Sequence, residues 1–139
     1  MLIEPAVDTD FPTLCALFND ARIDNGSFPN PKIELADFMT QVEGEKILVA
    51  RIEKNIAGFA SVWTKECFLH HLYVSPQYQR QGIGGRLLLE CVRAFGLPMA
   101  LKCVEANIPA RNFYEKMGWR AIESADGPEG RYILYMRQF

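Results

Sequence analysis

Glycine is the first residue type in this 139-residue chain whose spacing points to chemistry. Gly82, Gly84 and Gly85 follow a predicted strand and directly precede an apolar helical pattern. Each glycine costs about 0.5–1 kcal/mol relative to alanine in a helix, so three together indicate a role. Glycines let the backbone approach a bound group, and the first N–H groups of a helix are unpaired donors. The segment therefore predicts an anion cradle suited to phosphate, with a simple tight turn as the alternative.

Two histidines and a tyrosine are candidates for moving protons. His70 and His71 lie together in "FLHHLYV", where strand alternation predicts that they point to opposite faces. Tyr114 lies in a helical pattern further along the chain. An imidazole accepts protons near neutral pH and a phenol can donate one. Each of these residues could equally be a packed or hydrogen-bonded core group.

The elements that must position these residues follow from hydrophobic periodicity. The pattern predicts helices over about 8–21, 32–42, 86–95 and 108–117, and strands at 2–6, 46–52, 56–63, 67–74, 99–104, 119–124 and 131–137. Short connections predict that the strands from 46 to 74 pair as an antiparallel meander. The strand, glycine loop, helix and strand from 67 to 104 predict a parallel right-handed crossover. The expected fold class is α/β of the mixed α+β kind, with a central mixed, mostly antiparallel sheet flanked by helices.

Composition limits the class of protein. A net charge of −2 and 49% apolar residues fit one domain over residues 1–139 and give no electrostatic footprint for nucleic acid. With no apolar stretch long enough for a bilayer, we expect no membrane association and a cytoplasmic protein. Cys15, Cys67, Cys91 and Cys103 form no CxxC pair, so we expect neither disulfides nor a metal site.

Two common phosphate motifs do not match the glycine loop. A dinucleotide fingerprint requires a third glycine where this chain has Leu87, and a P-loop ends in GK[ST] rather than "GGR". A nucleotide-binding domain remains a weaker alternative.

A longer pattern resembles the GNAT superfamily of acetyl-CoA-dependent N-acetyltransferases. The acyl-CoA-binding signature [QR]-x-x-G-x-[GA] is similar to Gln79, Gly82 and Gly84, which follow Leu72 and Val74. Downstream, "NIPARNFYEKMGW" resembles the family's motif N-x-x-A-x-x-[FL]-Y-x-x-x-G-[FW]. The likeness runs from about residue 46 to the C-terminus.

The resemblance implies a sheet splayed at an acyl-CoA cleft, with acetyl-CoA as co-substrate and no metal. Main-chain groups from Arg80 to Gly85 would hold the diphosphate, and those of Leu72 and Val74 would pair with the pantetheine arm. Asn107 would bind near that arm or serve as a simple helix cap. The implied coenzyme contacts are Leu72, Tyr73, Val74, Gln79, Arg80, Gln81, Gly82, Ile83, Gly84, Gly85, Arg86, Asn107 and Tyr114.

The resemblance also assigns catalytic roles. Tyr114 would be the acid that protonates the departing thiolate, and His70, preferred over His71, would be the base for the acceptor amine. Glu66 and Glu105 remain alternative bases, and the Leu72 N–H is the expected oxyanion donor. A covalent route through Cys67 or Cys103 is the weaker alternative, because thiols in apolar strands have raised pKa values.

The implied function is acetyl transfer to a primary amine. A small-molecule acceptor is favoured, and a protein N-terminus or lysine remains open. Asp20, Asp24, Glu34 and Asp37 could attract a cationic amine, and Phe28 and Trp63 could wall its pocket. The alternative is a noncatalytic acyl-CoA-binding sensor. A homodimer is possible if the strand at 131–137 forms a sheet edge.

Overall fold

The computed structural model describes residues 1–25 and 32–139. Its strands form one seven-stranded sheet in the order β1-β2-β3-β4-β5-β7-β6. They are β1 (Leu2–Pro5), β2 (Lys46–Ile52), β3 (Asn55–Trp63), β4 (Phe68–Val74), β5 (Met99–Val104), β6 (Arg120–Gly127) and β7 (Gly130–Arg137). All neighbours pair antiparallel except β4 and β5, which are parallel. The predicted mixed, mostly antiparallel sheet is confirmed.

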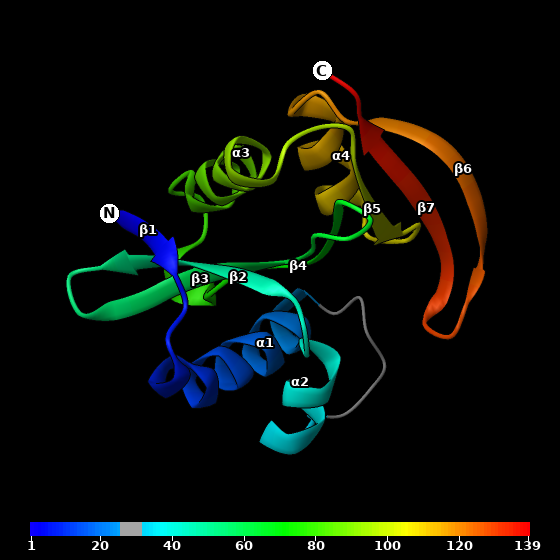
Figure 1. Ribbon diagram of the computed structural model, residues 1–139. Coiled ribbons are helices and arrows are strands. Elements are labelled where there is room, and N and C mark those ends of the chain that lie inside the picture. The colour runs from blue at the N-terminus through cyan, green and yellow to red at the C-terminus, as the bar shows by residue number, and fades with distance from the viewer. Residues whose placement is uncertain (26–31) are drawn as a thin grey trace.

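Helices cover both faces of this sheet (Figure 1). They are α1 (Phe11–Asn25), α2 (Leu35–Gln41), α3 (Ile83–Phe95) and α4 (Ile108–Lys116), with short 3-10 turns η1 (Asp8–Asp10) and η2 (Pro76–Tyr78). On one face, α1 and α2 bury Leu14, Phe18 and Phe38 against β2 and β3. On the other, α3 buries Leu87 and Leu88 in a second cluster. Within the described residues, no helix is both long and apolar enough to span a membrane.

Two sequence expectations about element boundaries are wrong. Helix α3 begins at Ile83 rather than Arg86, so Gly84 and Gly85 lie in its first turn and Gly82 is its N-cap. Helix α1 continues to Asn25, beyond the predicted end near Ala21. At the start of α3, the glycine backbone faces side chains of Val74, Phe113 and Met117, so packing outweighs the low helix propensity of glycine.

The proposed dimer edge is also wrong. Strand β7 lies between β5 and β6, with backbone pairing on both sides, so it is an interior strand. The sheet instead ends at β1 and β6. The last strand of the chain thus becomes the second neighbour of β5, and the β6–β7 hairpin places β6 at the edge outside it.

Candidate functional site

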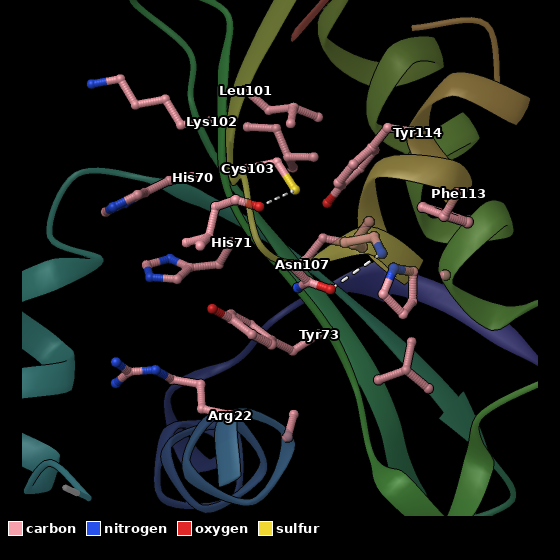
Figure 2. Close-up of a pocket in the computed structure, with 18 of the residues that line it drawn as sticks. Arg22, His70, His71, Tyr73, Leu101, Lys102, Cys103, Asn107, Phe113 and Tyr114 are labelled. Atoms are coloured by element: carbon pink, nitrogen blue, oxygen red, sulfur yellow. Dashed lines mark hydrogen bonds between the residues drawn. The ribbon is translucent and has the colours of Figure 1, made fainter. Parts of the chain in front are cut away.

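A cleft of about 820 Å³ opens where β4 and β5 separate. The two strands pair at only two positions, Phe68 with Ala100 and Leu69 with Leu101. Beyond these positions, Leu72 to Val74 of β4 and Cys103 to Val104 of β5 line the cleft. Figure 2 shows Tyr73 of β4 and Cys103 of β5 among its lining residues. The splay expected from the resemblance is therefore present, and it leaves a stretch of β4 backbone unpaired by β5.

A β-bulge in β4 changes where the histidines point. On β3, Val62 pairs with Leu69 of β4, and the adjacent Ser61 pairs with His71. His70 therefore has no partner on β3 and is the extra residue of the bulge. A bulge interrupts the alternation of side chains along a strand. The rings of His70 and His71 lie 4.0 Å apart, and both line the cleft. The expectation that they occupy opposite faces is wrong.

Glu45, the residue just before β2, joins the histidine pair. Its buried carboxylate lies 2.6 Å from Nδ1 of His70 and 3.9 Å from Nδ1 of His71. The hydroxyl of Ser61 on β3 donates a short hydrogen bond to the same carboxylate. A carboxylate only accepts hydrogen bonds, so the proton of His70 lies on Nδ1 and Nε2 is left as an acceptor.

The two imidazoles differ in their surroundings. His71 is 5% exposed, and its ring makes an edge-to-face contact with that of Phe18, with the ring centroids 5.4 Å apart. Burial, with the nearby charges of His70 and Arg22, lowers the pKa of His71 to about 3. The His70 side chain is 41% exposed. His71 is therefore neutral at physiological pH and a poor proton acceptor, whereas the bulge presents His70 to solvent in the cleft.

The amino end of α3 also lines the cleft. Gly82 adopts φ +79°, and a Cβ added there would meet no atom within 4 Å. Arg80 also has a positive φ of 65°, and the Gln79 side chain donates to the Val74 carbonyl at 3.2 Å. The first helical N–H to bond back is that of Arg86, onto Gly82. Within the part of the chain that the structure describes, the N–H groups of Ile83, Gly84 and Gly85 have no backbone partner, an arrangement that suits an anion.

Most of the predicted coenzyme contacts come together around this cleft. Those that line it are Leu72, Tyr73, Val74, Gln79, Arg80, Gly82, Ile83, Gly84, Gly85, Asn107 and Tyr114. Gln81 and Arg86 are exposed and do not line it. Asn107 caps α4, since its side-chain oxygen accepts the Ala110 N–H at 3.3 Å.

Tyr114 comes from α4 and points its hydroxyl into the cleft near β5 (Figure 2). Its ring packs against Phe113, Trp119 and Tyr135. Burial raises the pKa of Tyr114, so the hydroxyl keeps its proton at neutral pH. The residue therefore combines a packed ring with a polar end in the cleft.

The thiols near the cleft are poor nucleophiles. Burial raises the pKa of Cys103, which lines the cleft, to about 11. The pKa of Cys67, outside the cleft, is also raised by burial. A thiolate is the reactive form, so neither environment favours the covalent route. All four cysteines are free thiols, as expected.

Several other candidates lie away from the cleft. Glu66 is exposed in the β3–β4 turn, Glu105 pairs with Arg131 at 3.5 Å, and Trp63 packs beneath Gly44. The carboxylates of Asp20, Glu34 and Asp37 are exposed and do not line the cleft. The Asp24 side chain and Phe28 lie outside the described residues.

Sequence reasoning missed three residues at this site. Glu45 precedes His70 by 25 positions, and no local motif links the two. Arg22 of α1 and Glu129 of the β6–β7 turn form an ion pair of 3.6 Å where they line the cleft. A lone carboxylate, arginine or turn residue carries no spacing signal, so these long-range meetings appear only in the folded chain.

Comparisons with known proteins agree with this geometry. The GNAT acetyltransferase domain family matches residues 26–137. The "probable N-acetyltransferase Rv2775" of Mycobacterium tuberculosis is 38% identical over 74 residues, which cover 46% of this chain and 42% of that protein. The matched part is thus less than half of the relative's length.

Solved structures share the fold at low identity. A GCN5-related N-acetyltransferase from Rhodopseudomonas palustris has a TM-score of 0.84 at 18% identity, covering 99% of this chain and 95% of that one. The protein yncA of Salmonella typhimurium, solved with acetyl-CoA, has a TM-score of 0.76 at 18% identity, covering 99% and 93%. Because the family match covers most of the residues, including the glycine loop and Tyr114, this chain belongs to the GNAT acetyltransferase family.

Proposed function

We propose that this protein transfers the acetyl group of acetyl-CoA to a primary amine, with a small-molecule amine as the favoured acceptor. The observation that carries the proposal is the cleft itself. It places an anion cradle, an unpaired strand edge, a protonated tyrosine and a carboxylate-bound histidine along one continuous cavity.

The residues present fit the coenzyme. Diphosphate would bind the N–H groups at the start of α3, where Gly82 leaves open space that a side chain would fill. The backbone of Leu72 and Val74, left without a partner from β5, would pair with the amides of the pantetheine arm as an added strand does. Acetyl-CoA supplies the acetyl group as a thioester.

His70 would remove the proton of the acceptor amine. An alkylamine with a pKa near 10 is neutral in about one molecule per thousand at pH 7, and only the neutral form is a nucleophile. Glu45 holds Nδ1 of His70 at 2.6 Å and so directs Nε2 as the proton acceptor. Once this first proton has passed through His70 to solvent, the C–N bond forms and the C–S bond breaks, and the second proton lost by the nitrogen passes to His70.

Tyr114 would donate a hydrogen bond to the departing sulfur. A thiol has a pKa near 8.5, below that of a phenol, so complete transfer from tyrosine to thiolate is uphill. Burial raises the pKa of Tyr114 further, which widens the difference in pKa between the phenol and the thiol. Its main contribution is therefore a hydrogen bond to the developing thiolate, with solvent restoring the balance of protons.

The acceptor end of the cleft supports a small substrate. Phe18, Ala21 and Tyr132 line it, and the Arg22–Glu129 ion pair connects α1 with the β6–β7 turn across it. A contact of this kind narrows the path for a folded protein segment. Structural neighbours include a ribosomal-protein-alanine N-acetyltransferase and a phosphinothricin N-acetyltransferase, so both acceptor classes belong in the test.

The test is thiol release from acetyl-CoA over a panel of amines. The panel contains amino acids, polyamines, arylalkylamines and peptides with a free N-terminus or lysine. Turnover with a small amine at a higher kcat/KM than any peptide supports the proposal, and mass spectrometry of the product locates the new amide. Tight acetyl-CoA binding without turnover of any amine would instead favour the noncatalytic sensor.

A further inference from the structure

Two distant stretches of the chain bring three metal-ligand groups together beside the cleft. Donor atoms of Glu45, His70 and His71 all lie within 4.8 Å of one another. We propose that these three side chains form a binding site for Zn²⁺, and that the bound ion inhibits acetyl transfer. Two imidazole nitrogens and one carboxylate are a donor set that zinc accepts in proteins.

The spacing of the donors suits a small cation. Zinc binds nitrogen and oxygen donors at about 2.0–2.2 Å, which places neighbouring donors of a tetrahedral site roughly 3.3 Å apart. The Glu45 carboxylate lies 2.6 Å from Nδ1 of His70 and 3.9 Å from Nδ1 of His71, on either side of that value. Side-chain shifts of about 1 Å or less would equalise them.

His71 supplies an independent indication of a ligand. Its Nδ1 is buried and has no hydrogen-bond partner among the residues that the structure describes. A buried polar atom without a partner is costly, and most such atoms are satisfied by protein, water or an ion. The 3.9 Å gap to Glu45 is too long for a hydrogen bond but has room for a bridging ion.

The surroundings of the site resemble an outer coordination shell. The Ser61 hydroxyl donates to Glu45 and fixes the orientation of its carboxylate. The bulge that places His70 beside His71 lies directly opposite Ser61 on β3. His70 is 41% exposed, so the fourth position of the ion would face solvent in the cleft and hold water.

Occupancy of this site has a consequence that rests on the proposed function. The ion would bind Nδ1 of neutral His70, whose single ring proton would then lie on Nε2, and would take over the Glu45 carboxylate. His70 would then be held as a ligand rather than oriented as a base. Zinc is therefore expected to lower kcat without displacing acetyl-CoA, because Glu45, His70 and His71 are not among the residues predicted to contact the coenzyme.

The primary experiment measures binding without any substrate. Protein without a polyhistidine tag is freed of metal with a chelator and titrated with ZnCl₂ in a calorimeter. Co²⁺ serves as an absorbing probe, since a tetrahedral site gives intense visible bands. We expect one ion per chain. His70→Ala and Glu45→Gln should each weaken binding at least about tenfold, as loss of a zinc-supporting group does.

Matched variants separate this site from other donors. Glu66→Gln removes an exposed carboxylate from the β3–β4 turn, and Cys67→Ser removes a half-buried thiol; both should bind zinc as the wild type does. His70 is partly exposed, so His70→Ala should fold, which its thermal unfolding will show. Absence of stoichiometric binding, or wild-type affinity in both His70→Ala and Glu45→Gln, would overturn the proposal.

Activity assays then distinguish the two proposals. Each variant is compared with its own activity in the metal-free state. If the metal-free wild type acetylates an amine, and one equivalent of zinc suppresses this activity in the wild type but not in Glu45→Gln, both the transfer reaction and the inhibitory zinc site are supported. Zinc binding that leaves turnover unchanged would refute the inhibitory role. Zinc binding by a protein that turns over no amine would leave the metal site intact and refute the proposed transfer reaction.

Discussion

Tyr114 is the residue whose environment is most distinctive in the cleft. Its ring is fixed by aromatic neighbours, while its hydroxyl keeps its proton because burial raises its pKa. Tyr114→Phe should therefore lower kcat about 100-fold, within the range for loss of a hydrogen bond to charge that develops in the transition state, and change the Kd for acetyl-CoA less than about threefold. Steady-state kinetics and calorimetric titration measure the two effects separately.

A matched tyrosine variant controls for packing. Tyr135 is fully buried, and its hydroxyl donates to Glu115 at 2.6 Å outside the cleft. Tyr135→Phe should lower the free energy of unfolding by about 1 kcal/mol and leave kcat within twofold of wild type. If Tyr114→Phe and Tyr135→Phe reduce kcat equally, the assignment of Tyr114 as the hydrogen-bond donor to the departing sulfur is wrong.

Glu45 is expected to act through His70 rather than on the amine directly. Its carboxylate is 6% exposed and bonded to His70 and Ser61, and it does not line the cleft. In buffer that contains a metal chelator, Glu45→Gln should lower kcat about tenfold and His70→Ala should lower it about 100-fold. The double variant should be no slower than His70→Ala, because the two groups form one unit. If the loss of kcat in the double variant equals the product of the two single losses, Glu45 has a role separate from that of His70.

At the scale of elements, the amino end of α3 joins conformation to binding. Gly82 and Gly96 flank this helix, both have positive φ, and neither has an atom within 4 Å of an added Cβ. Gly82→Ala and Gly96→Ala should each cost about 1 kcal/mol of stability because alanine is strained in that conformation. Only Gly82→Ala should weaken acetyl-CoA binding, by about tenfold or more.

The paired glycine design separates strain from recognition. Urea unfolding gives the stability of each variant, and calorimetry with CoA gives its affinity. Gly82 lines the cleft and Gly96 does not, so equal affinities in the two variants would show that the loop does not bind the diphosphate. A large loss of affinity in Gly96→Ala would point to general destabilisation instead.

Local sequence signals predicted most elements but not their irregularities. The strands from 46 to 74 and the parallel crossover were predictable because hydrophobic periodicity and short turns are local. The start of α3 was displaced by three residues because consecutive glycines read as a loop. The bulge at His70 was hidden because a bulge depends on register with β3, and alternation within one strand does not contain that information.

At the scale of the whole molecule, the candidate site combines both ends of the chain. The glycine loop and Tyr114 follow recognisable spacing, so the part of the cleft proposed to hold the coenzyme was predictable from sequence. The part proposed to act on the acceptor draws Arg22 from α1, Glu45 from just before β2 and Glu129 from the β6–β7 turn. These residues meet only through the sheet order, in which β4 and β5 separate at its centre.

The arginine that ties the first strand to the sheet makes stability depend on pH. Arg51 on β2 donates to Asp10 at 3.1 and 2.7 Å and to Glu4 of β1 at 2.6 Å. This hydrogen bonding lowers the pKa of Asp10 from its ordinary 3.8, although burial opposes the shift. Since the unfolded chain then binds the proton more readily, the stabilisation is complete above about pH 5 and is lost as pH falls through the lowered pKa.

Asp10→Asn should therefore lower the free energy of unfolding by about 2 kcal/mol at pH 7, the scale of a hydrogen bond to a charged group. The difference from wild type should shrink below about pH 4, because protonation removes the same charge from the native protein. Urea unfolding at pH 7, 4 and 3 measures it, with Asp8→Asn, an exposed neighbour in the same turn, as the control. A deficit that stays constant down to pH 3 would mean that Asp10 contributes through packing or shape, and that the charge of the Arg51 cluster does not hold β1 and η1 to the sheet.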